Sequence, residues 1–187
     1  QSYDHDWSLV ELDQQLGAEY GWMGVISHDY ADYDQDIGPV NLVAYSGDKF
    51  MFSPGGHYGC RIRGRLSFSN FKSLLHDCDA TKGSSGGGLF QIQGKSIDKV
   101  RPYIVALNYA AFIPPNKLEV TDAYSSTYSN LAIKSSAFFA KIFEIINSSN
   151  TNYSAAREQP RVYVPPPVEG KEEEESKPIR EIIIYVA

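Results

Sequence analysis

The segment 78–89, with the sequence CDATKGSSGGGL, constrains the rest of the chain most strongly. Ser85 has Gly83 before it and three glycines after it, and the apolar pair Leu89 and Phe90 follows at once. Such glycines allow unusual backbone dihedrals and close approach of a substrate. A serine nucleophile needs an exposed hydroxyl on such a turn, with N–H groups free to face a developing oxyanion. The alternative is a flexible Gly/Ser linker, against which the flanking cysteine, aspartate and strand-like residues argue.

Short apolar runs separated by turn residues dominate the chain before and after this loop. Thirteen tyrosines and fifteen glycines among 187 residues favour strands over helices. The expected strands are residues 7–12, 40–45, 50–52, 59–62, 89–93 and 103–107. The last two strands are predicted to form a hairpin. Spacing of this kind indicates a mostly β protein, either a barrel or a sandwich.

Residues 135–146 differ, because their apolar side chains recur at helical spacing. They predict one amphipathic helix that closes the domain and packs an aromatic stripe into the core. The stripe consists of Phe138, Phe139, Ile142, Phe143 and Ile146.

The composition changes after Asn147, so we divide the chain into a domain over 1–147 and an extended tail over 148–187. The tail contains the stiff Pro165–Pro167 element and the charge run 171–175. Its strongly β-prone segment 182–186 is expected to pair with a sheet edge, in this chain or in a partner.

Composition and charge exclude several classes of function. The net charge of −6 argues against a nucleic-acid partner. No apolar run is long enough to span a bilayer, and no signal peptide is present, so a secreted form would be already processed. The four histidines show no zinc spacing with Cys60 or Cys78, so we expect no metal and no other cofactor. The two cysteines are either a disulfide, which implies an oxidising compartment, or two free buried thiols.

Nucleophilic chemistry at Ser85 requires a base, usually histidine, and a group that orients the base. The N–H groups of Gly83 and Ser85 are two residues apart, which suits an oxyanion hole on one turn. Asp79, six residues before the serine, can floor a pocket that favours a Lys or Arg side chain. An exposed turn aspartate is the other interpretation of Asp79.

Several of these segments resemble chymotrypsin-fold serine peptidases, including the trypsin-like and V8-like (glutamyl-endopeptidase-like) groups. The pattern Asp79-x-x-x-Gly83-x-Ser85-Gly-Gly resembles their nucleophile loop. The stretch from Asp6 to Leu12 resembles the strand that begins with their triad aspartate, and YSGDK at 45–49 resembles their YPGDK turn. The similar pieces keep the family's order over roughly residues 3 to 147.

The resemblance implies a double β-barrel, with part of the first barrel, the whole second barrel, a C-terminal helix and an extended tail. It implies a Cys60–Cys78 disulfide and an extracytoplasmic location, secreted or in an oxidising lumen. It also implies Ser85 as nucleophile, Asp6 as the residue orienting the base, and Gly83 and Ser85 as oxyanion donors. The substrate-binding residues that it implies are Asp79, Asn108, Tyr109, Ala110 and Ala111.

The sequence departs from this family at the catalytic base, the histidine. The family's histidine precedes the aspartate, and only five residues precede Asp6. His5 would point to the opposite strand face, and His57 and His76 follow the aspartate in predicted loops. Ser84, Asn108 and Gly88 also replace residues that are common in the family.

Two explanations of the missing base define two functions. In the first, the chain is a serine endopeptidase subunit that cleaves peptide or protein substrates, and an N-terminal companion chain from the same precursor supplies the histidine. In the second, the protein is a catalytically silent pseudo-protease that acts as an interaction or structural subunit of a larger assembly.

Overall fold

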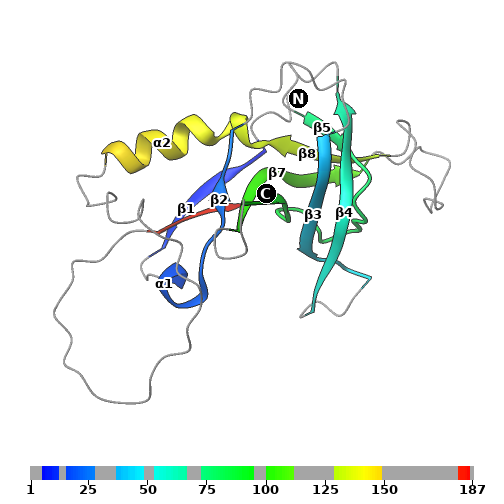
Figure 1. The fold of residues 1–187 in the computed structure, drawn as a ribbon, viewed down its shortest axis with the longest axis horizontal. Helices are drawn as coiled ribbons and strands as arrows, with labels where there is room; N and C mark the ends of the chain where they lie inside the picture. The colour runs from blue at the N-terminus through cyan, green and yellow to red at the C-terminus, as the bar shows by residue number, and fades with distance from the viewer. Residues whose placement is uncertain are drawn as a thin grey trace, which may run out of the picture.

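An antiparallel β-barrel dominates the computed structural model of this protein (Figure 1). The structure describes residues 6–12, 16–27, 37–48, 53–66, 73–94, 100–111, 129–148 and 181–185. Its elements in chain order are β1 (Ser8–Leu12), α1 (Leu16–Tyr20), β2 (Gly24–Val25), β3 (Ile37–Tyr45), β4 (Pro54–Arg65), β5 (Ser73–His76), β6 (Gly88–Gln93), β7 (Arg101–Ala111), β8 (Asn130–Lys134), the 3-10 helix η3 (Ser135–Ala137), α2 (Phe139–Ser148) and β9 (Glu181–Tyr185).

Six strands close the barrel. They follow the order β7-β6-β3-β4-β5-β8, and β8 pairs back onto β7. All of these pairings are antiparallel. The short strand β2 adds to β7 in parallel, with Gly24 opposite Tyr103. The edge of β7 is therefore shared, since β2 pairs with its first half and β8 with its second half.

Alternation along the strands places one set of side chains inside the barrel. On β3, Val40, Leu42 and Ala44 are buried, whereas Val43 and Tyr45, which alternate with Leu42 and Ala44, are exposed. This period of two is what a strand with one covered face requires. One buried cluster takes aliphatic side chains from all six strands, among them Leu42, Ile62, Leu74, Leu89, Val105 and Ala132. A second cluster joins Leu107, Tyr109, Leu131 and Ile133 to Phe138.

A separate two-stranded sheet joins the two ends of the described chain. β1 pairs antiparallel with β9, with Ser8 opposite Tyr185 and Leu12 opposite Glu181. Figure 1 shows these strands side by side next to the barrel, in blue and red. The prediction that the C-terminal β-prone segment pairs with a sheet edge is confirmed, and the edge belongs to this chain. Trp7, just before β1, packs on Phe138 with ring centroids 5.9 Å apart.

The predicted closing helix is present as η3 followed by α2. Phe138 between them is fully buried, as expected for a core residue. Phe143 stacks on Phe139 but is 46% exposed, so the prediction that the whole stripe lies in the core is wrong there. Within the described residues, no helix has the length and apolarity needed to cross a membrane.

The predicted mostly β class is confirmed, but the predicted double barrel is wrong. The described residues contain one closed barrel, and the strand that was expected to begin at a triad aspartate in a first barrel, β1, pairs instead with β9 of the tail. The predicted hairpin of 89–93 and 103–107 is confirmed as β6 and β7. His57 and His76 lie in β4 and β5, so their prediction as loop residues is wrong. The strand predicted at 50–52 and most of the tail lie outside the described residues.

Candidate functional site

The loop between β5 and β6 is held in place by Ser84. This side chain is fully buried, and its hydroxyl lies 2.8 Å from the hydroxyl of Ser46. The same oxygen accepts a hydrogen bond from the Thr81 N–H at 3.2 Å, and the Ser84 N–H donates to the Thr81 carbonyl at 3.0 Å. Since buried polar groups are costly unless bonded, this set of contacts fixes the turn on which the next residue stands.

Two glycines of the loop are required by its geometry. Gly83 has φ +94°, and a Cβ there would lie 3.1 Å from the Tyr45 carbonyl oxygen. A Cβ at Gly87 would lie 2.7 Å from the Ala44 side chain. The glycine-rich sequence therefore reflects a tight turn packed against β3 rather than a flexible linker.

Ser85 presents its hydroxyl at the surface of this turn. The residue is exposed, and its Oγ donates to the Tyr109 carbonyl on β7 at 3.2 Å. Within the described part of the chain, the N–H groups of Gly83 and Ser85 donate no hydrogen bond. Two unengaged amides beside an exposed serine are the donors that an oxyanion needs.

Asn108 on β7 connects the turn to the barrel. Its backbone accepts from the Gly86 N–H at 2.8 Å and donates to the Gly87 carbonyl at 2.9 Å. Its side-chain amide donates to the Ser84 carbonyl at 3.0 Å. Asn108 is 3% exposed, so the structure makes it a support of the turn.

Ala110 and Ala111 end β7 beyond the serine loop. On one side they pair with Leu131 and Asn130 of β8. On the other side β6 begins at Gly88, and no strand in the described residues pairs with this stretch. The predicted role of this edge in holding substrate backbone stays a prediction.

Asp79 lies away from the serine hydroxyl, beside His57. Its backbone N–H donates to His57 Nδ1 at 2.8 Å. Both residues line a small polar cavity of about 30 Å³, together with Asp48 and Thr81, and Ser85 does not line it. Asp79 is exposed at its rim, so its two interpretations as pocket floor and as turn aspartate stay open.

Neither of the two histidines that the structure describes is hydrogen-bonded to Ser85. Among the described histidines, His57 contacts Asp79 and His76 contacts Asn108. Asp6 lies half-buried just before β1, and no described hydrogen bond or ion pair joins it to either histidine. His5 and His28 lie outside the described residues. Among the described residues, the serine, its unengaged amides and β7 are thus assembled without a histidine base.

His76 is a functional candidate that the sequence analysis missed. It is fully buried in the barrel, and its Nε2 lies 3.1 Å from Asn108 Oδ1. Burial lowers its pKa to about 4, against the opposing effects of the Asn108 hydrogen bond, the Asp77 charge and the Leu131 backbone. The signal available in the sequence was its place directly after Leu74 and Leu75 in an apolar run.

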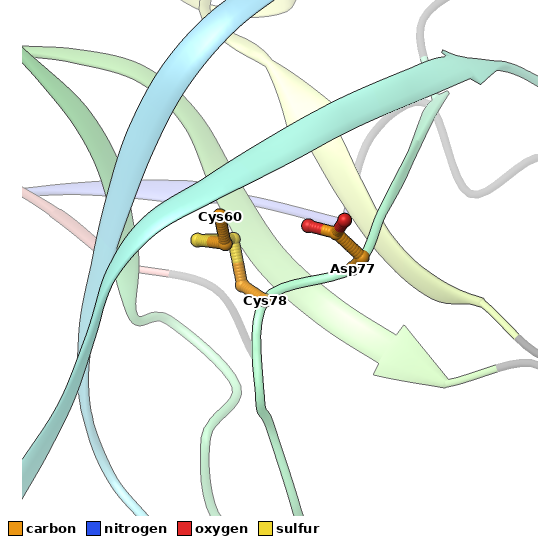
Figure 2. A group of neighbouring side chains, drawn as sticks. All are labelled: Cys60, Asp77 and Cys78. Carbon is orange, nitrogen blue, oxygen red and sulfur yellow. A yellow bond between two sulfur atoms is a disulfide. The ribbon is translucent and has the colours of Figure 1, made fainter. Parts of the chain in front are cut away.

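The Cys60–Cys78 disulfide ties β4 to the start of the serine loop (Figure 2). Both cysteines are buried, and Asp77 lies beside Cys78. The two sulfur atoms and the Asp77 carboxylate lie close enough to share a metal ion, but the sulfurs are bonded to each other and are not thiolates. The carboxylate of Asp77 instead accepts from the Arg61 N–H at 2.6 Å and pairs with Arg63 at 2.6 Å. The predicted disulfide is confirmed, and it indicates an oxidising environment.

Fold and loop together define a mostly β protein that presents an exposed serine on a turn beside a closed six-stranded barrel. No protein-family model matches the chain. A stretch of 38 residues is 47% identical to the MltA-interacting protein of Escherichia coli (strain K12), and the same holds for that of Shigella flexneri. The match covers 19% of this chain and 15% of the length of each relative.

These comparisons correct the family resemblance inferred from the sequence. The assignment to chymotrypsin-fold serine peptidases is wrong, because the similarity found lies with MltA-interacting protein and the described chain has one barrel in place of two. The short motifs around Ser85 occur in the order of that family, yet a four-glycine turn, a disulfide and a strand are each compatible with other β folds. Roles for individual residues must therefore be argued from the geometry of this chain alone.

Proposed function

We propose that this chain is a serine hydrolase subunit in which Ser85 performs acyl transfer on a peptide bond. The supporting observation is the pair of unengaged N–H groups of Gly83 and Ser85 beside an exposed hydroxyl. In this mechanism the Ser85 Oγ attacks the carbonyl carbon, its proton passes to a base, and the two amides stabilise the oxyanion. Collapse of the oxyanion breaks the C–N bond, and the amine leaves with the proton that the base returns to it. Water then hydrolyses the acyl-enzyme, which releases the acid and restores the Ser85 hydroxyl.

The hydroxyl of Ser85 is not activated by its present partner. A carbonyl oxygen, here that of Tyr109, accepts the hydroxyl proton in a hydrogen bond but cannot remove it. The proposed activity therefore depends on a histidine from another segment, and we assign that segment to a companion chain of the same precursor.

Labelling with a fluorophosphonate probe tests this function on the protein together with whatever chain co-purifies with it. The expected result is one adduct on Ser85, abolished in the Ser85→Ala variant. Ser46 serves as a matched internal control, because its side chain lies beside the same loop but its hydroxyl is hydrogen-bonded to that of Ser84. An assembled protein whose Ser85 stays unlabelled refutes the hydrolase.

A second candidate function is binding without catalysis, as a structural or interaction subunit of the cell envelope. It is supported by the partial similarity to MltA-interacting protein and by the lack of a described histidine at Ser85. Purified MltA immobilised on a biosensor provides the test. Saturable binding that survives Ser85→Ala favours this role, and no binding at micromolar concentrations removes its main support.

A further inference from the structure

Two buried polar side chains, His76 and Asn108, meet inside the barrel although their strands are not neighbours. β8 lies between β5 and β7 in the sheet order. The histidine is fully buried and the asparagine 3% exposed, and 3.1 Å separates Nε2 from Oδ1. Burying such polar groups is unfavourable unless they are hydrogen-bonded. A buried polar pair in an otherwise aliphatic core therefore points to a function other than packing.

The hydrogen bonds fix which atom carries each proton. Asn108 Nδ2 donates to the Ser84 carbonyl, so the Oδ1 atom faces His76 as an acceptor. The Nε2 atom of His76 must therefore carry the proton, which makes the ring the neutral Nε2–H tautomer. Its Nδ1 atom is buried and has no hydrogen-bond partner among the described residues.

Asn108 is joined to the turn that carries Ser85 by three hydrogen bonds. The side chain bonds the Ser84 carbonyl, and the backbone bonds Gly86 and Gly87. Ser85 stands between these anchored positions. Its own hydroxyl bonds the Tyr109 carbonyl, which belongs to the residue after Asn108. Rotation of the Asn108 side chain would remove one of the two donors to the Ser84 carbonyl and leave the Gly87 N–H, at 3.0 Å, as the other.

We propose that His76 and Asn108 form a buried positioning pair, in which His76 locks the Asn108 amide and Asn108 locks the turn that presents Ser85. The effect on Ser85 reactivity rests on the proposed hydrolase function, whereas the locking of the turn does not. His76 acts from β5 without touching the reacting atoms, so it is a positioning residue. The charged group beside it is Asp77, which Arg63 pairs from β4.

Amide hydrogen exchange and imidazole nitrogen NMR on the full chain test the pair without requiring activity. The wild type is expected to show His76 as the Nε2–H tautomer at neutral pH. In His76→Phe, the amides of Gly86 and Asn108 should exchange about ten-fold faster or more. His76→Gln is the rescue variant, because its amide nitrogen can donate to Asn108 Oδ1 from a similar position, and protection should return.

Leu74→Val provides the control for general destabilisation, since Leu74 is fully buried on the same strand and its aliphatic side chain cannot form a hydrogen bond with Asn108. It should change the exchange of Gly86 no more than that of Leu42 on β3. An Nδ1–H tautomer for His76 overturns the pair. Equal loss of protection at Gly86 and Leu42 in His76→Phe also overturns it.

Fluorophosphonate labelling of the assembled protein tests the catalytic consequence separately. Displacement of a reacting group by about 1 Å lowers rates by on the order of 100-fold. His76→Phe should therefore slow labelling of Ser85 about 100-fold, and His76→Gln should restore most of it. If the wild type itself does not react, the hydrolase fails while the exchange results still decide the positioning pair. Full labelling of His76→Phe contradicts its effect on Ser85.

Discussion

Removing the Cys60–Cys78 disulfide should lower the free energy of unfolding by about 3 kcal/mol. The two cysteines are 18 residues apart in sequence. In the chain-entropy model, closing a loop of that length removes roughly 11 cal/mol/K from the unfolded state, or about 3 kcal/mol at 25 °C. The double variant Cys60→Ala/Cys78→Ala tests this value. Alanine is chosen over serine because both sites are buried, and a serine hydroxyl there would lack a hydrogen-bond partner.

Urea denaturation followed by tryptophan fluorescence is the assay, with the wild type measured in oxidising and in reducing buffer. The reduced wild type and the double variant should unfold at similarly lowered midpoints. Reducing agent should leave the double variant unchanged, which controls for effects of the reagent. A double variant within about 1 kcal/mol of the oxidised wild type would refute the loop-closure reasoning. Two free thiols in the denatured, non-reduced wild type would refute the bridge itself.

Three further predictions concern the serine turn, the buried histidine and the terminal sheet. Gly83→Ala should destabilise the fold by about 1–3 kcal/mol, because of its φ of +94° and the close Tyr45 carbonyl. Gly21→Ala, with φ +81° and open space around it, is the urea-denaturation control that isolates the carbonyl contact. For His76, the folded pKa of about 4 lies below the unfolded value of 6.5, so protons bind the unfolded chain first. The stability that the neutral, buried His76 gives the folded state is complete above pH 6.5. It is lost as the pH falls toward 4, by about 3 kcal/mol in total. His76→Gln should flatten the stability profile in that window, and an unchanged profile would contradict the lowered pKa. Deleting residues 181–187 should abolish the exchange protection of β1 and leave that of β6 unchanged, whereas equal loss in both strands would contradict their independence.

The spacing of apolar residues along the sequence correctly predicted those strands and helices that depend on neighbouring residues. The alternation in 89–93 and 103–107 predicted a hairpin, and the helical spacing after Ser135 predicted the closing helix, because each depends on neighbours in sequence. The glycines around Ser85 predicted a tight turn for the same reason. The β-prone tail segment predicted strand pairing, although its partner β1 could not be named.

Closure of the barrel could not be predicted in this way. It depends on β8 pairing with both β5 and β7, and those strands are separated by stretches with no repeating pattern. His57 was predicted in a loop because glycine and proline surround it, yet β4 runs through Gly55 and Gly56. Here pairing with β3 overrides a weak local preference.

The candidate site was predicted only in part. Asn108 was placed with Ser85 and Gly83 only by the family resemblance that proved wrong, and in the structure Asn108 bonds the residues on both sides of Ser85. The sequence did not reveal that Asn108 supports the turn or that His76 supports Asn108, since both links cross the barrel. Side-chain hydrogen bonds between distant strands leave no periodic trace in a sequence.

The pairing of β1 with β9 has a consequence for how this chain folds. Ser8 and Tyr185 are opposite each other although nearly the whole chain lies between them. Closing so long a loop has a large entropic cost, and a two-stranded sheet offers few contacts in return. This sheet is therefore expected to form after the barrel and to open before it. The barrel can then complete its folding while the two strands are still apart. When the β1–β9 sheet opens, a protease can cleave β9 although the barrel is still folded.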